Sequence, residues 1–201
     1  MEILPESIKK LINILSYFPS IGPRQATRLA FYLINKGQNE IIGLIKNLEA
    51  LNKIKICNFC FFPHENQNEL CDICQNTERN KSIIMIIEKE TDLLSLEKAN
   101  QFNGRYLIIG EISKKGILEE WQKLRLQNLK SFIQRELNGK AEEIILAFNP
   151  DSIGNFTSSI IEKEIRDFSK KITRLARGLP TGGEIEFADD ETLKSAIQNR
   201  V

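Results

Sequence analysis

Two closely spaced pairs of cysteines are the residues of this chain whose type and spacing point most directly to chemistry. All four cysteines lie between residues 57 and 74, as two Cys-x-x-Cys pairs separated by residues 61–70: Cys57, Cys60, Cys71 and Cys74. Each pair can present two thiolates from one short turn, so the spacing predicts a tetrahedral Cys₄ zinc site. Four thiolates leave no position for a water molecule, and we therefore expect this zinc to hold the fold together rather than to catalyse a reaction.

Two other uses of cysteine pairs fit this chain less well. Disulfides are typical of secreted proteins, but no apolar signal segment follows Met1 and Glu2, and a chain of 201 residues can bury a core without such bridges. A thioredoxin-like redox site needs one pair at the start of a helix, not two facing pairs.

The single histidine of the chain lies between the two cysteine pairs. His64 could in principle replace a cysteine as a zinc ligand, but we expect it on the surface of the loop 61–70. A lone histidine at this place also argues against a Ser-His or Cys-His hydrolase.

A second candidate site is a glycine turn flanked by arginines, in the segment from Phe18 to Ala30. This segment is typical of a helix-hairpin-helix, in which Gly22 lets a phosphate approach the amides at the start of the second helix. Arg24 and Arg28 would flank that phosphate from one face of the helix. Such a site contacts the DNA backbone and not the bases, so binding would be independent of sequence and sensitive to salt. The alternative is an ordinary αα-hairpin whose turn contains Gly and Pro.

The charge of the chain is balanced overall, at +1, but unevenly distributed. Residues 1–55 contain more Lys and Arg than Asp and Glu, so a contact with a polyanion is expected there. No apolar run approaches the length of a membrane span, and together with the absence of a signal segment this predicts a cytoplasmic protein without a membrane contact.

Two acidic residues follow apolar segments that are predicted to be buried strands. Glu88 comes directly after Ile83–Ile87, and Asp151 follows Ile144–Phe148 across an Asn-Pro pair. Acidic groups at the carboxyl ends of parallel strands commonly hold Mg²⁺, so these two residues are candidate ligands of a weakly bound magnesium ion. The alternative is that each is a solvated loop residue or the cap of a helix.

The elements that would position these residues follow from the apolar periodicity. Helical periodicity predicts helices over residues 6–18, 23–36, 40–51, 91–99, 117–137 and 157–171, while continuous apolar runs predict strands over 83–87, 106–109 and 144–148. Strands that alternate with helices in this way indicate an α/β domain with a mainly parallel sheet. The Gly-rich tail is expected to form a short strand over 185–187 and a terminal helix.

The order of these parts resembles the RecR family of recombination mediators over nearly the whole chain. The closest pieces are Leu15–Arg24, Ala99–Tyr106 and the segment Arg174–Glu186, which contains Gly-Leu-Pro-Thr-Gly-Gly-Glu. The resemblance implies a helix-hairpin-helix domain at 1–55, a Cys₄ zinc finger at 56–78, a Toprim domain at 79–175 and an oligomer contact at 176–201. It also implies a protein without catalytic activity that forms a ring, a tetramer built as a dimer of dimers. With RecO and RecF, such a ring helps to load the recombinase onto gapped single-stranded DNA.

Two segments depart from this family pattern. Catalytic Toprim domains carry further acids where this chain has Asn149, Ile153 and Asn155, so Glu88 and Asp151 are the acids that remain. The family commonly has a Gly/Pro-rich loop after Gly110, whereas here Ser113–Gly116 leads quickly into a long predicted helix with Trp121. The competing function is a small Mg²⁺-dependent Toprim nuclease or primase-like enzyme, which would need more than two carboxylates to clamp the reacting oxygens. A third reading, a zinc-ribbon interaction module without a role on DNA, is opposed by the arginines of the hairpin.

Overall fold

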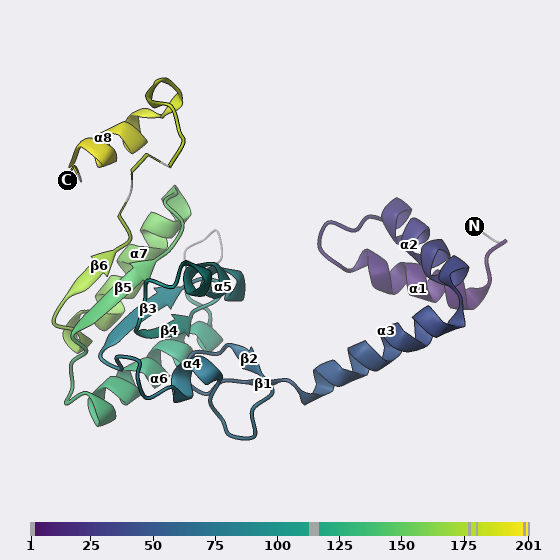
Figure 1. The fold of residues 1–201 in the computed structure, drawn as a ribbon, viewed down its shortest axis with the longest axis horizontal. Coiled ribbons are helices and arrows are strands. Elements are labelled where there is room, and N and C mark those ends of the chain that lie inside the picture. The colour runs from purple at the N-terminus through teal and green to yellow at the C-terminus, as the bar shows by residue number, and fades with distance from the viewer. Residues whose placement is uncertain (1–2, 113–116, 177, 180, 199, 201) are drawn as a thin grey trace. The chain divides into compact units, whose positions relative to one another are not determined.

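The computed structural model describes residues 3–112, 117–176, 178–179, 181–198 and 200 (Figure 1). Contacts within the chain divide it into two compact units, Met1–Ile54 and Lys55–Val201, and each is described by itself below. Across the described residues, no helix combines the length and the apolar character needed to cross a bilayer.

Three helices form the N-terminal unit: α1 (Glu6–Ser16), α2 (Pro23–Lys36) and α3 (Gln38–Ala50). Proline at the first position of α2 suits a helix start, because its fixed φ is already helical and the amide that it lacks has no partner there. Gly37, with a φ of 89°, ends α2 and begins α3. Ala26 and Ala30 on α2 are fully buried, and their small side chains let α1 pack closely. The three predicted helices are thus confirmed to within a few residues at their ends.

The second unit begins with the cysteine segment. Its short strands β1 (Lys55–Ile56) and β2 (Pro63–His64) pair antiparallel, and a one-turn helix, α4 (Asp72–Gln75), follows. The Ile108 amide of the next domain donates to the Cys60 carbonyl oxygen at 3.0 Å, so the cysteine segment is joined to the main sheet by a backbone hydrogen bond.

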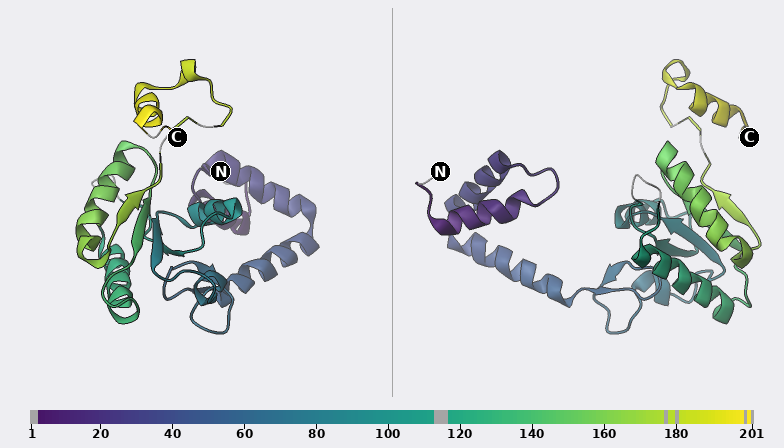
Figure 2. Two further views of the ribbon diagram at one scale, coloured as in Figure 1. Left: turned by 60° about the vertical axis from the view of Figure 1, so that its left-hand side comes forward. Right: turned by 180° about the vertical axis from the view of Figure 1, so that it is seen from behind.

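A four-stranded parallel sheet forms the centre of this unit. In spatial order its strands are β4 (Arg105–Ile108), β3 (Ile83–Ile87), β5 (Glu143–Ala147) and β6 (Ile172–Arg174). Helix α5 (Glu90–Ala99) covers one face, while α6 (Glu120–Glu136) and α7 (Ser152–Ile165) cover the other (Figure 2). Crossovers between parallel strands are right-handed, so the direction of each crossover along the sheet decides which face its helix covers. The chain crosses one way from β3 to β4 and the opposite way from β4 to β5 and on to β6, which places α5 on one face and α6 and α7 on the other. Strands β3 and β4 are buried along almost their whole length, which confirms the α/β prediction.

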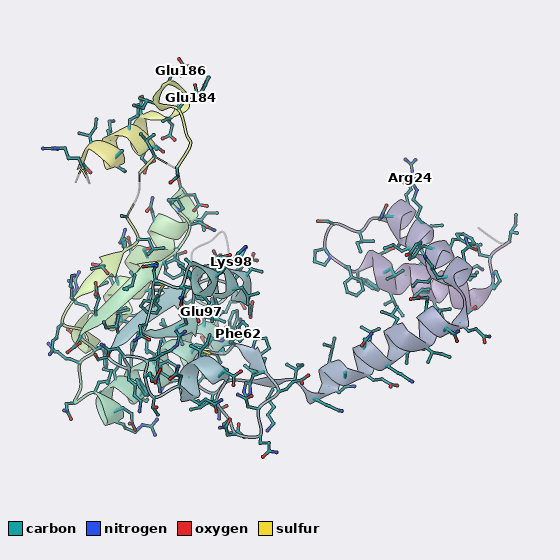
Figure 3. The ribbon with its side chains drawn as sticks, in the orientation of Figure 1. Arg24, Phe62, Glu97, Lys98, Glu184 and Glu186 are labelled. Atoms are coloured by element: carbon teal, nitrogen blue, oxygen red, sulfur yellow. The ribbon has the colours of Figure 1, made fainter. Side chains whose placement is uncertain are left out.

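Three predicted elements need correction. Helix α7 begins at Ser152 rather than residue 157 and ends at Ile165, because the side chain of Asp151 accepts from the Gly154 amide at 2.7 Å and caps the helix there. The short strand β6 was not expected at all. The predicted strand over 185–187 is a single 3₁₀ turn, Ile185–Phe187, followed by α8 (Asp190–Gln198). Among the described residues no strand pairs with this turn, and its side chains, including that of Glu186, are exposed, as is Glu184 just before it (Figure 3).

Candidate metal centre and nucleic-acid interface

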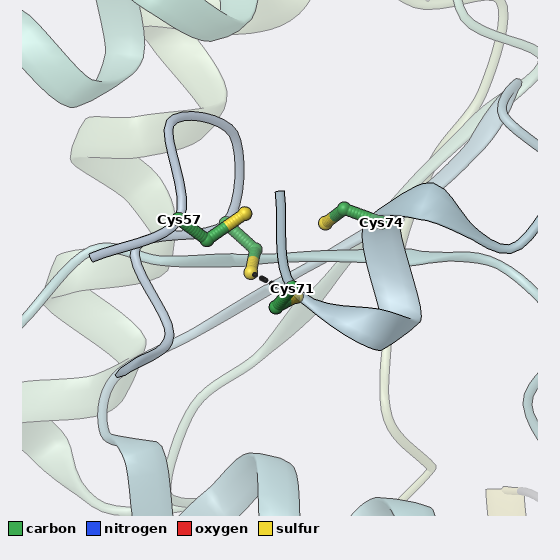
Figure 4. A group of neighbouring side chains, drawn as sticks. Cys57, Cys71 and Cys74 are labelled. Carbon is green, nitrogen blue, oxygen red and sulfur yellow. Dashed lines mark hydrogen bonds between the residues drawn. The ribbon is translucent and has the colours of Figure 1, made fainter. Parts of the chain in front are cut away.

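The four cysteine side chains converge on one point inside the second unit (Figure 4). Their sulfur atoms all lie within 4.8 Å of one another, the Sγ atoms of Cys60 and Cys71 are 3.4 Å apart, and no disulfide joins them. A tetrahedral zinc with Zn–S bonds of about 2.3 Å needs sulfur atoms about 3.8 Å apart, so this donor set fits Zn²⁺. Among the described residues, no other group of three or more Cys, His, Asp or Glu side chains is close enough to hold a metal.

The local backbone explains why the sequence presents thiolates in this way. In the first pair, the Phe61 amide donates to the Cys57 carbonyl at 3.0 Å, and the Phe62 amide approaches the Cys60 sulfur at 3.5 Å. In the second pair, Cys71 precedes α4, and the Gln75 amide donates to the Cys71 carbonyl at 3.0 Å. Both turns aim two sulfur atoms at the same place, as the spacing predicted.

Protons compete with a cation for the sulfur atoms of this centre. The pKa values of the Cys60 and Cys74 thiols are raised, first by their hydrogen bonds to Cys57 and further by burial. A metal dication would displace the protons that these thiols otherwise keep. Metal binding and folding of the segment are therefore coupled.

His64 was predicted on the surface, and this prediction is wrong. The residue pairs within β2 and is only 8% exposed, while its Nδ1 accepts from the Asn66 amide at 3.2 Å. It is not one of the four converging ligands. Polar residues follow it in the sequence and suggested a surface loop, but His64 lies in β2, which pairs with β1.

The hairpin of the N-terminal unit presents both predicted arginines to solvent. Arg24 and Arg28 are exposed on α2, and within the described residues neither forms an ion pair (Figure 3 labels Arg24). No side chain caps the start of α2, so the first-turn amides of Arg24 and Gln25 are available to an outside acceptor. Gly22 has a φ of −81°, which any residue adopts, and a Cβ added there would meet nothing within 4 Å. The fold therefore does not require glycine at this place.

Glu88 and Asp151 line one small pocket, of about 270 Å³, at the carboxyl end of the sheet. Burial raises the pKa of Glu88, and the neighbouring Lys89 opposes this effect. A third carboxylate missed by the sequence analysis, Glu111, lines the same pocket and pairs with Lys89 at 2.7 Å. Only its position just beyond the end of a strand could have revealed it.

Asp151 also has a structural use, because its side chain caps α7. The residues that replace further acids, Asn149 and Ile153, line the pocket with it. The three carboxylates do not gather into a group that could hold a metal. The predicted loop Ser113–Gly116 lies outside the described residues.

Tyr106 is not placed to act as an activated nucleophile. Tyr106 is fully buried in β4, and its hydroxyl donates to the Glu97 carboxylate at 2.7 Å. Burial, and then this hydrogen bond, raise the pKa of Tyr106. A buried hydroxyl that holds its proton this firmly is a poor nucleophile.

Comparison with known proteins covers almost the whole chain. The family model for the RecR helix-hairpin-helix matches residues 8–51, the Toprim domain model matches 82–176, and the model for the RecR C-terminal region matches 178–201. A recombination protein RecR of Dehalococcoides mccartyi (strain 195) is 39% identical, over 96% of this chain and 93% of the relative. The recombination protein RecR of Staphylococcus aureus (strain MRSA252) is 36% identical, over 98% of this chain and 97% of the relative. That of Prochlorococcus marinus (strain MIT 9515) is also 36% identical, over 100% of this chain and 98% of the relative. The chain belongs to the RecR family.

Proposed function

We propose that this protein is a non-enzymatic, DNA-binding recombination mediator that acts in the cytoplasm. In this role it works with RecO and RecF to help load the recombinase onto gapped single-stranded DNA. The observation that carries the DNA-binding part is the uncapped start of α2, where exposed Arg24 and Arg28 stand beside a glycine that the fold does not need. The family's name for its members, recombination protein, supports the wider role.

The same proposal assigns the parts of the chain. Residues 1–55 bind DNA through Gly22, Arg24 and Arg28, and residues 56–78 hold a structural zinc. Residues 79–175 form a Toprim domain without turnover, in which Glu88 and Asp151 bind Mg²⁺ at most weakly. The segment 176–201 contacts a neighbouring subunit.

A ring-shaped tetramer is part of the proposal as well. Large apolar side chains of the N-terminal unit remain exposed, among them Phe18, Tyr32 and Leu48 at 54–57%. Pairing of two such units would cover this surface, as expected for a small domain with little core of its own. Light scattering that finds a monomer at micromolar concentration would exclude the ring in the absence of DNA and partners.

Removal of both hairpin arginines tests the DNA contact. The double variant Arg24→Ala/Arg28→Ala should bind unrelated DNA sequences more weakly, and to the same extent. The slope of log affinity against log salt concentration should become less negative by about 2, because each phosphate contact in the complex releases about one counterion and two contacts are lost. Fluorescence anisotropy titrations at several salt concentrations measure both quantities.

The matched control removes two other cations from the same unit. Lys46 and Lys53 are exposed on or next to α3, and Lys46→Ala/Lys53→Ala should leave the salt dependence nearly unchanged. If the arginine variant instead keeps the parent's slope, the contact lies elsewhere, with Lys9, Lys10 and Lys36 as the next candidates. Gly22→Ala adds a further check. It should cost about 1 kcal/mol of stability, because glycine is a better N-cap residue than alanine, and the protein that stays folded should bind DNA more weakly than the parent.

The competing function, a Mg²⁺-dependent Toprim nuclease or primase-like enzyme, makes the opposite prediction at the sheet. We expect no cleavage, relaxation or primer synthesis with Mg²⁺ or Mn²⁺, and we expect Glu88→Ala to change RecO binding or complementation instead. Assays of DNA products, run on the parent and on Glu88→Ala, separate the two. Activity that co-purifies with the protein and vanishes in Glu88→Ala would establish the enzyme.

A further inference from the structure

A second cavity, of about 550 Å³, opens where the cysteine segment meets α6. It lies outside the zinc cluster and the carboxylate pocket. Its apolar part is formed by three phenylalanines and a leucine: Phe59, Phe61, Phe132 and Leu70. Its polar part contains three cations and a single acid: Lys81, Arg105, Arg135 and Glu136.

Arg105 is the buried cation of this cavity. It is 6% exposed, and its guanidinium lies 5.1 Å from the ring centre of Phe59 and 5.3 Å from that of Phe132. One guanidinium nitrogen donates to the Cys74 carbonyl at 2.8 Å, but Nε is buried without a hydrogen-bond partner. No described carboxylate pairs with this charge. A buried cation without a paired acid is costly to a fold, so an anion bound in this cavity would offset part of that cost.

The two other cations stand at the mouth of the cavity. Lys81 and Arg135 are exposed, and in the part of the chain that the structure describes neither forms an ion pair. Other cations of this unit do form ion pairs, as Lys130 does with Glu164 at 2.7 Å. Among the described residues none of the three cations is in an ion pair, so with one acid, Glu136, the lining of the cavity has an excess of positive charge.

The aromatic rings help to decide which anion fits. Sequence-independent binding of single-stranded DNA uses open ring faces on which bases stack. Here the guanidinium of Arg105 lies over Phe59 and Phe132, and that of Arg125 lies 4.5 Å from the ring centre of Phe61. Phe59 is in addition almost fully buried. An apolar side chain that enters between the ring edges, with carboxylates at the mouth, suits this geometry better than a base.

We propose that this cavity binds an acidic peptide segment of a partner protein. An apolar side chain of the peptide would fill the space between Phe61, Leu70 and Phe132, and flanking carboxylates would pair with Lys81 and Arg135. Amides and a hydroxyl at the mouth, Asn58, Asn128 and Ser131, offer partners for the peptide backbone. The site shares no residue with the hairpin or with the carboxylate pocket, so peptide binding can be tested independently of the proposed DNA contact.

A short fluorescent peptide, Glu-Asp-Phe-Asp-Glu between Gly-Ser flanks, is the probe. The full-length protein with its metal should bind it saturably, and binding should weaken as salt is added. Replacing the phenylalanine of the peptide by serine, or its acids by amides, should abolish binding. Charge reversal in Lys81→Glu/Arg135→Glu should weaken binding at least about tenfold, because two attractive surface contacts become repulsive.

The matched control reverses two exposed lysines of the same unit that do not line the cavity, in Lys98→Glu/Lys140→Glu, and should change affinity by less than about twofold. Circular dichroism and metal content confirm that both variants fold. The proposal is overturned if the parent does not bind the probe, or if both double variants lose binding equally. It is also overturned if Lys81→Glu/Arg135→Glu loses binding of a single-stranded oligonucleotide but not of the peptide, which would assign the cavity to nucleic acid. A changed mass in solution with unchanged peptide binding would instead assign it to a second copy of the chain.

Discussion

A Cys71→Ser variant should lose its zinc and, with it, the folded cysteine segment. Cys71 is 2% exposed and belongs to a set of four sulfur atoms that all lie within 4.8 Å of one another. Structural zinc contributes roughly 10–16 kcal/mol of apparent binding free energy, which is comparable with the whole stability of a domain, about 5–15 kcal/mol. We expect less than one zinc per chain by metal analysis and a melting transition that is broadened or shifted down by many degrees.

The control for this variant lies in the same loop. Glu65 is exposed between the two cysteine pairs, and Glu65→Gln should keep the zinc content and melting temperature of the parent. Addition of a strong chelator to the parent should reproduce the Cys71→Ser result. A Cys71→Ser protein of normal stability, or parent protein prepared without chelator that contains no zinc, would show that the centre is not a structural zinc site.

A Gly154→Ala variant should be destabilised by about 1–3 kcal/mol through overpacking. A Cβ at this position would lie 2.0 Å from the Asn149 carbonyl oxygen and within 3.2 Å of two further backbone atoms of that residue. Backbone atoms cannot swing aside as a side chain can, so either the start of α7 or the turn before it must move. The Gly154 amide also donates to Asp151, which lines the carboxylate pocket with Glu88, so the pocket should distort as well.

Urea denaturation measures this effect, and a substitution on the same helix controls for helix propensity. Ser159 is exposed on α7, and its hydroxyl makes only a local bond to the Asn155 carbonyl at 3.0 Å. Ser159→Ala should therefore change stability by no more than about 0.5 kcal/mol. If Gly154→Ala is equally mild, the close approach of α7 to Asn149 is not a constraint on this fold.

The sequence predicted the fold wherever one signal decided the outcome. The run Ile83–Ile87 is short and rich in β-branched residues, which favours a buried strand over a helix, and Pro23 marked the start of α2 to the residue. Prediction failed where tertiary contacts decide. Strand β6 has three residues, Ile172–Arg174, and is a strand because β5 offers it an edge. The run Ile185–Phe187 has two large apolar residues where β6 has one, but no strand of the described residues pairs with it, and it forms a 3₁₀ turn instead.

The candidate sites show the same division. The cysteine ligands could be read from spacing alone, because a metal imposes its own geometry on short turns. The burial of His64 and the stacking of Arg105 could not be predicted from the sequence, because both depend on how the cysteine segment packs against the rest of its unit. Glu111 was missed for a similar reason: its carboxylate reaches the pocket only because the chain turns there at Gly110, with a φ of 86°.

The hydrogen bond between the Ile108 amide and the Cys60 carbonyl has a consequence for solubility. Strand β4 is the last strand on its side of the sheet, and such an open edge can pair with a strand of another molecule. The cysteine segment lies against this edge and takes up one of its free amides, while Arg105 of the same strand is tied to the Cys74 carbonyl. A metal bound by the four cysteines would thus also protect a sheet edge, and we expect a chain without that metal to expose this strand and to aggregate more readily.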